Sequence, residues 1–339
     1  MSLTLPTIQS FDVERATKVS RTGGGVAGIL LVGLVSMPWW AGRGELRFIT
    51  EFLYFLSLAQ MWNLLAGYGG LVSIGQQAFV GIGAYTILAA VKFLGMPPYL
   101  MLPVSGLVAV FLALPTAALL FRLRAAYFAI GAWVVAEVFR LLVANTPAVG
   151  GGSGASITEA VRDIPAWWRD ALTFWTAVFV GVGAMALVYL LLRSRFGLAL
   201  TAIRDSERAS ISLGVRASRI KLFVYLIAAF GAGVVGGLIT LSKLRISPDA
   251  AFSVDWTAVT IFIVVIGGIG TVEGPLVGAI VYFALRSMLG DLGPIYMITL
   301  GIMAVGVMLV YPKGIWGYVA QRWDIHFFPV QRRLKSKDS

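Results

Sequence analysis

Ten long apolar segments recur along the chain of 339 residues. A helix needs roughly 20 apolar residues to cross the hydrocarbon core of a bilayer, and there it satisfies its own backbone hydrogen bonds. We therefore predict an all-α polytopic membrane protein of about ten transmembrane helices, with a single transmembrane domain over residues 25–312. The predicted spans are 25–41, 48–66, 71–95, 99–121, 126–145, 171–192, 221–242, 254–270, 274–289 and 295–312.

Composition argues against several other classes of protein. Only 13% of the residues are charged and 58% are hydrophobic, whereas soluble domains carry about 25% charged residues. The net charge of +11 does not indicate a nucleic-acid partner, because the basic residues lie in loops and tails between spans, where membrane topology requires them. The absence of cysteine and the single histidine, His326, argue against a metal site or a bound cofactor. We therefore expect membrane lipid to surround the protein.

The distribution of lysine and arginine predicts that both termini are cytoplasmic. With the N-terminus inside, the inside segments carry 18 of these residues and the outside segments carry 8, as the positive-inside rule requires. Residues 1–24 and 313–339 are then cytoplasmic tails, and residues 146–170 form a periplasmic loop.

The segment 193–221, RSRFGLALTAIRDSERASISLGVRASRIK, is the strongest charge signal in the chain. Seven of its residues are cationic, which predicts a cytoplasmic location. It is longer than the usual connection between helices, about 2–8 residues, and apolar residues recur in it at approximately helical spacing. Two interpretations stay open from the residues alone: a solvated loop that only sets topology, or a helix on which another protein acts.

A glycine-rich stretch, AGYGGLVSIGQQAFVGIGAY at 66–85, places polar side chains beside apolar runs. Ser73, Gln76 and Gln77 are expected at or near membrane depth, where unpaired amides cost free energy. They either bond to neighbouring helices or line a hydrated path. The glycines of this stretch, and those of IGGIGTVEGPLVGA at 266–279, indicate close helix packing or a broken backbone that protein or water covers.

Glu137 and Arg140 are ionisable residues inside the predicted span 126–145. A spacing of three residues puts them on one helix face, where they can pair. Such residues within a membrane span are candidates for function. The alternative is a self-neutralising pair that faces the helix bundle.

The chain lacks the motifs of the common catalytic sites. It contains no G-x-x-x-x-G-K-[ST] phosphate-binding loop, no G-x-S-x-G and no H-E-x-x-H. We therefore predict no enzymatic activity and no catalytic residues. A transporter subunit powered by a separate ATPase fits, and so does a secondary transporter driven by an ion gradient.

Five stretches of the sequence carry a family resemblance. They are NLLAGYGGLVSIGQQAFVGIGAY (63–85), YFAIGAWVVAEVFRLL (127–142), GGGSG (150–154), GLALTAIRDSERASISLGVRASRIKLFVYLIAAFGAGVVGGL (197–238) and VVIGGIGTVEGPLVGA (264–279). Together they resemble the permeases of branched-chain amino acid ABC importers, in order over about residues 45–312. The acidic pair Asp205 and Glu207 is more similar to the LivM type than to its LivH partner.

The resemblance implies a type II-like ABC importer permease bundle in the inner membrane of a bacterium. It also implies partners: a second permease subunit of the LivH type, two cytoplasmic ABC ATPase subunits and a periplasmic solute-binding protein. Related permeases carry urea and short amides, or aromatic and other small carboxylates. The chain departs from the family pattern at Gly131–Val134, which includes Trp133, and at 151–154. The solute therefore stays open between these classes and branched-chain amino acids.

The resemblance further implies two sets of functional residues. The segment 193–221 becomes a coupling element that seats on an ATPase, and Gly214 is a natural helix stop. A tentative translocation path faces the partner permease, with Ser73, Gln76, Gln77 and Glu137 along it. The residues expected to meet the ATPase are Arg204, Asp205, Ser206, Glu207, Arg208, Leu213, Gly214 and Val215.

Overall fold

Helices form almost all of the regular structure in a computed structural model of the chain. The structure describes residues 11–14, 18–290, 294–311, 313–323, 327–328 and 333–336. His326 and much of the two predicted tails lie outside these ranges. The long helices are α1 (Lys18–Trp40), α2 (Arg43–Asn63), α3 (Gln77–Leu94), α4 (Leu102–Leu120), α5 (Ala126–Ala144), α6 (Ala166–Arg193), α9 (Ala217–Lys243), α11 (Asp255–Gly267), α12 (Gly274–Leu289) and α13 (Pro294–Val310).

Each predicted span corresponds to one of these helices, and the prediction of an all-α polytopic fold is confirmed. Within the described residues, seven helical stretches are long and apolar enough to cross a membrane. The apolar parts of α1 and α12, Gly24–Trp40 and Gly274–Leu289, are shorter. Helix α2 carries four charged residues in its first half, which lowers its mean hydropathy.

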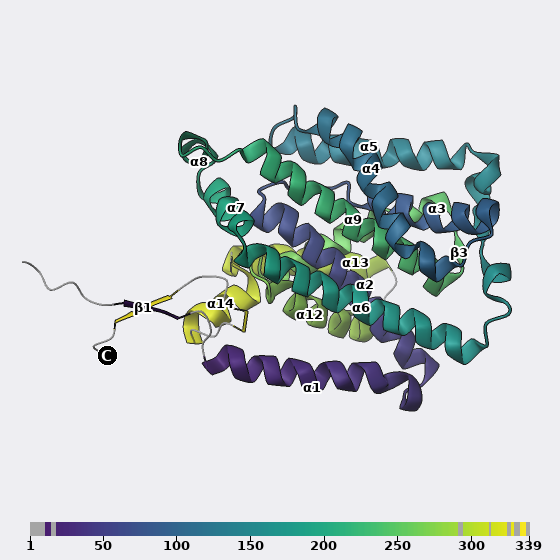
Figure 1. Ribbon diagram of the computed structural model, residues 1–339, viewed down its shortest axis with the longest axis horizontal. Coiled ribbons are helices and arrows are strands. Elements are labelled where there is room, and N and C mark those ends of the chain that lie inside the picture. The colour runs from purple at the N-terminus through teal and green to yellow at the C-terminus, as the bar shows by residue number, and fades with distance from the viewer. Residues whose placement is uncertain are drawn as a thin grey trace, which may run out of the picture.

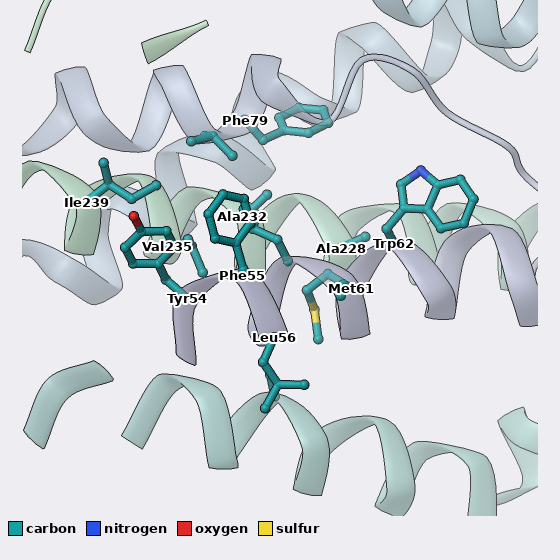
Figure 2. Packing of buried hydrophobic residues seen from close by; sticks show 14 of the residues in the cluster. Tyr54, Phe55, Leu56, Met61, Trp62, Phe79, Ala228, Ala232, Val235 and Ile239 are labelled. Carbon is teal, nitrogen blue, oxygen red and sulfur yellow. The ribbon is translucent and has the colours of Figure 1, made fainter. Parts of the chain in front are cut away.

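Helices α2 and α9 form the centre of the bundle. Helix α9 packs against α3, α4 and α2, and α2 also packs against α6. Figure 2 shows α2 side chains such as Phe55 and Met61 beside Ala232 and Val235 of α9. Small residues permit a close approach of α3 to α9, because a Cβ added at Gly83 of α3 would lie 1.9 Å from the carbonyl oxygen of Gly233. The predicted close packing of glycines is therefore confirmed.

The two ends of the bundle carry different short elements (Figure 1). One end, called here the α8 end, holds α7 (Arg195–Asp205), α8 (Glu207–Ser212) and α14 (Gly314–Trp323). The opposite end, the β3 end, holds β2 (Ala155–Ser156) paired antiparallel with β3 (Arg245–Ile246), and α10 (Pro248–Ala251) follows β3.

The two terminal segments lie side by side. Strand β1 (Phe11–Glu14) pairs antiparallel with β4 (Arg333–Ser336), with Phe11 opposite Ser336. Figure 1 shows β1 and its partner strand beyond the α8 end. An even number of spans puts both termini on one side of a membrane, so this pairing agrees with the predicted even count. The cytoplasmic assignment of that side stays a prediction.

The backbone between α2 and α3 leaves the regular α-helix at two points. A π-helical turn, η1 (Leu64–Tyr68), extends α2, and residues 69–76 then run without helical structure. The predicted helical start at residue 71 is therefore wrong, and α3 begins at Gln77. Gly70 adopts a positive φ of 68°, which ends the preceding turn. The broken backbone expected from this glycine-rich stretch is present.

The segment 193–221 folds as two short helices instead of one. Helix α7 ends at Asp205, and Ser206 is the N-cap of α8, where its Oγ accepts a hydrogen bond from the Ala209 backbone N–H at 3.3 Å. Serine in this position favours a new helix start over continuation. Gly214, at φ 86°, follows α8 and ends it as predicted.

The connection from α5 to α6 contains three short 3-10 turns, η3 (Pro147–Val149), η4 (Gly151–Ser153) and η5 (Thr158–Val161). Another 3-10 turn, η2 (Pro98–Met101), leads into α4. Helix α6 begins at Ala166, earlier than the predicted span. The connection includes β2, so it is anchored at the β3 end of the bundle.

Candidate functional site

Gln77 forms a buried hydrogen-bonded pair with Thr257 of α11. The Thr257 hydroxyl donates to the Gln77 side-chain oxygen, and the Gln77 backbone N–H donates to the Thr257 Oγ1 at 3.3 Å. Both residues are almost fully buried. Of the two interpretations of these amides, helix-to-helix bonding describes Gln77.

Gln76, its neighbour, is buried without a hydrogen-bond partner. Among the described residues, neither its side-chain nitrogen nor its side-chain oxygen has a partner, although only 4% of the residue is exposed. Leu65, Phe79, Tyr225 and Ala228 line the narrow space around it, together with Ser73. A buried amide with neither bond satisfied costs free energy, so Gln76 is the more unusual of the two glutamines.

Ser73 helps to hold the broken segment in place. Its carbonyl oxygen accepts a hydrogen bond from the Trp62 indole N–H at 2.8 Å, and its hydroxyl oxygen accepts one from the Gly75 backbone N–H at 3.2 Å. Gly75 in turn packs directly on α5, because an added Cβ would lie 2.0 Å from the Ala132 carbonyl oxygen. The segment 69–76 is thereby wedged between α2 and α5.

Glu137 lies on the outward face of α5 in an ion-pair cluster. The Arg140 Nε donates to both Glu137 carboxylate oxygens at 2.9 Å, which confirms the predicted pair. A further carboxylate, Asp249 of α10, accepts from Arg140 Nη1 at 2.5 Å. The side chains of Glu137 and Arg140 are 47% and 27% exposed in the isolated chain, so the pair does not face the interior of this bundle.

The four predicted path residues therefore do not form one site. Ser73 and Gln76 share a narrow space, Gln77 turns towards α11, and Glu137 lies on the outer face of α5. Asp249 was not predicted, because it is 109 residues from Arg140 and follows a Ser-Pro pair that reads as an ordinary helix start. Within the described residues, no group of three or more histidine, cysteine, aspartate or glutamate side chains could hold a metal ion.

The predicted coupling residues form an exposed projection at the α8 end (Figure 1). Every residue from Arg204 to Ala209 is exposed. Leu213 is 83% exposed, which is unfavourable for a large apolar side chain in water. Gly214 next to it is exposed as well. Val215 is half-buried. The projection thus combines charged groups with an uncovered leucine.

Two of the contacts between this projection and the bundle involve its charged residues. Glu207 of α8 forms an ion pair with Lys221 of α9 at 2.7 Å. Arg204 of α7 lies against the turn between α11 and α12, where a Cβ added at Gly270 would be 3.2 Å from its guanidinium nitrogen. The charged residues of the projection therefore contact α9 and the turn that follows α11.

Two amide side chains of α2 form hydrogen bonds with the backbone of the turn at 268–273. This pair was not predicted from the sequence. Asn63 donates from Nδ2 to the Thr271 carbonyl at 2.7 Å and accepts from the Gly270 N–H at 2.8 Å. Gln60 donates to the Val272 carbonyl at 2.8 Å. Both amides are completely buried. Helix α2 therefore joins the turn beside Arg204 to the broken segment 69–76.

The comparisons with known proteins agree with this architecture. A family model described as "Branched-chain amino acid transport system / permease component" matches residues 46–311. The permease protein LivM of the high-affinity branched-chain amino acid transport system of Escherichia coli is 29% identical over 84% of this chain and 73% of its own length. The corresponding LivM of Salmonella typhimurium is 28% identical over the same shares.

A more distant relative is the probable LivH permease protein of Methanocaldococcus jannaschii, 25% identical over 72% of this chain and 82% of its own length. No solved structure matches the chain. The LivM matches confirm the resemblance drawn from the five sequence stretches. The family is one of transport permeases of the inner membrane with several apolar helices, not one of enzymes. The chain belongs to the branched-chain amino acid transport system permease family.

Proposed function

We propose that this chain is one permease subunit of an ATP-driven ABC importer. It forms half of the translocation path together with a second permease of the LivH type. Two cytoplasmic ATPase subunits power it, and a periplasmic binding protein delivers the solute. The family match over residues 46–311 supports the permease role, and relatives named LivM and LivH support the pairing of two permease types.

The observation that carries the coupling role is the uncovered projection of α7 and α8. An apolar side chain as exposed as Leu213, 83%, among charged residues suits a protein interface with an apolar centre and a polar rim. ATP-driven closure of the ATPases pushes this projection. The Glu207–Lys221 ion pair and the contact of Arg204 with Gly270 pass the movement on to α9 and to the turn at 268–273.

The translocation path is proposed along the face of α5. Charged side chains half exposed inside a spanning helix are unfavourable against lipid, so Glu137 and Arg140 face the partner permease or water. The broken segment 69–76 packs on the same helix through Gly75 and brings Ser73 and Gln76 near it. Gln77 supports this wall through Thr257.

The solute of this importer is a branched-chain amino acid or a related small polar molecule. Permeases for urea and short amides, or for aromatic and other small carboxylates, are the alternatives of the same family type. We place the chain in a bacterial inner membrane with both tails cytoplasmic. The pairing of β1 with β4 supports a common side for the termini, and the excess of basic residues in the inside segments supports its assignment to the cytoplasm.

The coupling proposal is tested by a leucine-to-serine substitution at the projection. Leu213→Ser removes an exposed side chain, so the permease pair still inserts and folds, but the ATPase subunits no longer co-purify with it. Leu100→Ser is the matched control, because Leu100 is 69% exposed in η2, away from α7 and α8. Normal ATPase association of Leu213→Ser, or equal loss with both variants, would refute the assigned role.

A further inference from the structure

The cluster of Glu137, Arg140 and Asp249 has a net charge of −1, because two carboxylates share one guanidinium group. Arg140 uses Nε and Nη2 for Glu137 and Nη1 for Asp249, so its three nitrogens are engaged by the two carboxylates. The carboxylates keep free lone pairs that point outward, because Glu137 is 47% and Asp249 is 76% exposed. The cluster thus offers hydrogen-bond acceptors and a net negative charge on the outer face of α5.

A buried hydroxyl lies beside this cluster without a partner. Tyr85 of α3 is only 6% exposed, and its hydroxyl has no hydrogen-bond partner in the part of the chain that the structure describes. Its ring stacks on Phe252, which directly follows α10, with ring centroids 6.1 Å apart. Helix α10, which carries Asp249, packs against α3. A buried hydroxyl is normally satisfied, so this one marks a place where a further polar group fits.

The position of the cluster indicates at which end of the bundle it would contact a polar group of the solute. Glu137 is seven residues before the end of α5, about 10 Å along the helix. Asp249 comes from α10 at the β3 end, the end opposite the projection of α7 and α8. The cluster therefore lies towards the mouth through which a solute enters if the α8 end faces the cytoplasm.

We propose that Glu137 and Asp249, held apart by Arg140 and flanked by the Tyr85 hydroxyl, receive the ammonium group of the solute during passage. The inference rests on the proposed function, because it assumes that the outer face of α5 lines the path. Its chemistry selects among the solute classes. An ammonium group donates up to three hydrogen bonds and is attracted by the surplus charge, whereas a simple carboxylate is repelled. Amino acids carry that group, but urea, short amides and simple carboxylates do not.

The test measures the charge and water access of the site directly. The chain contains no cysteine, so Val134→Cys introduces a unique thiol. Val134 is 54% exposed and one helical turn before Glu137 on α5. The variant is reconstituted with its partner permease, and the thiol is labelled with a cationic trimethylammonium-ethyl or an anionic sulfonatoethyl methanethiosulfonate. The labelling rate of each reagent is divided by the rate at which the same reagent reacts with mercaptoethanol in solution.

The expected result is a preference for the cationic reagent of about tenfold or more, as focused fields in clefts produce. The preference falls to one or below when Glu137→Gln and Asp249→Asn are added, because Arg140 then leaves a net positive charge. Asp249→Asn alone lowers it partly, and this variant keeps the Glu137–Arg140 pair should the double variant misfold. The 3-methylbutylammonium ion, which is leucine without its carboxylate, slows labelling by the cationic reagent, whereas 4-methylpentanoate does not.

Three results would overturn the proposal: no reaction with either reagent, equal normalised rates, or a cation preference that survives removal of both carboxylates. Protection by 4-methylpentanoate but not by the ammonium ion would overturn it as well. Labelling requires neither ATP nor the binding protein. A negative labelling result would therefore refute the ammonium site without refuting ATP-driven transport. If the unmodified chain shows no ATP-driven uptake with its partners, the proposed function is refuted whatever the labelling shows.

Discussion

The Asn63 side chain holds the backbone of Thr271 from the end of α2, with its Nδ2 2.7 Å from the Thr271 carbonyl oxygen. The same amide accepts a hydrogen bond from Gly270 at 2.8 Å. Residue 63 is completely buried, and its two partners, Gly270 and Thr271, are half-buried. The contact fixes the turn at 268–273 against α2 and beside Arg204 of α7.

Asn63→Ala is therefore expected to destabilise the protein by about 1–3 kcal/mol, because it removes two hydrogen bonds and leaves a half-buried donor and a half-buried acceptor without these partners. The thermal midpoint of the detergent-solubilised protein measures this. Asn145→Ala is the matched control, since that amide is exposed and bonds only to Leu141 of its own helix; it should change the stability by less than about 0.5 kcal/mol. Equal midpoints for the two variants would contradict the role of the Asn63 contact.

The two adjacent glutamines are expected to respond in opposite directions to the same substitution. Gln76→Met removes a buried amide without partners, so the free energy of unfolding rises by up to about 1–3 kcal/mol. Gln77→Met leaves the Thr257 hydroxyl without its acceptor and lowers the free energy of unfolding by a similar amount. If Gln76 contributes to the path, ATP-driven uptake falls in Gln76→Met although the protein is more stable. A destabilised Gln76→Met would show that its amide has partners.

The contact of Gly75 with α5 leaves no room for a methyl group. An added Cβ would lie 2.0 Å from the Ala132 carbonyl oxygen, and a backbone atom gives way less easily than a side chain. Gly75→Ala is expected to cost about 3 kcal/mol or more through overpacking and to abolish transport. Gly183→Ala in α6 serves as the control, because nothing lies within 4 Å of its added Cβ. A thermal midpoint of Gly75→Ala as high as that of Gly183→Ala would contradict the packing described.

The ion pair of Glu207 and Lys221 is expected to matter for coupling more than for stability. Glu207 is 49% exposed on its side chain and Lys221 19%, and pairs of this kind contribute about 1 kcal/mol or less. Glu207→Lys and Lys221→Glu should each lower ATP-driven uptake with little change in thermal midpoint. The double exchange restores the pair with reversed polarity and should restore uptake. Failure of the double exchange to recover any activity would argue that the pair does not transmit movement.

The sequence was sufficient for the spans and for the fold class, because helical spans are encoded by local hydropathy alone. Each predicted span has a helix, and the pairing of Glu137 with Arg140 followed from helical spacing. The segment proposed for coupling was predicted from its charge, and its residues from Arg204 to Ala209 are exposed as that charge requires. These features depend on residues that are near one another in the chain.

The remaining features depend on residues far apart in the chain, where local patterns carry no signal. Asp249 joins Arg140 across 109 residues, and Asn63 meets Gly270 across 207. The break at 69–76 was placed inside a predicted span because its leucine, valine and isoleucine side chains raise the local hydropathy. The division of the coupling segment at Ser206 also escaped prediction, since the apolar spacing on either side of it looks continuous.

The account depends most on the source of energy, because a transport chain that lacks a phosphate-binding loop is powered either by a separate ATPase or by an ion gradient. The decisive measurement is uptake of radiolabelled leucine into proteoliposomes that contain this chain, its partner permease and the two ATPases, with binding protein outside and ATP enclosed. We predict uptake only when all components and ATP are present. Uptake by this chain alone, driven by a proton or sodium gradient without ATPase subunits, would contradict the account.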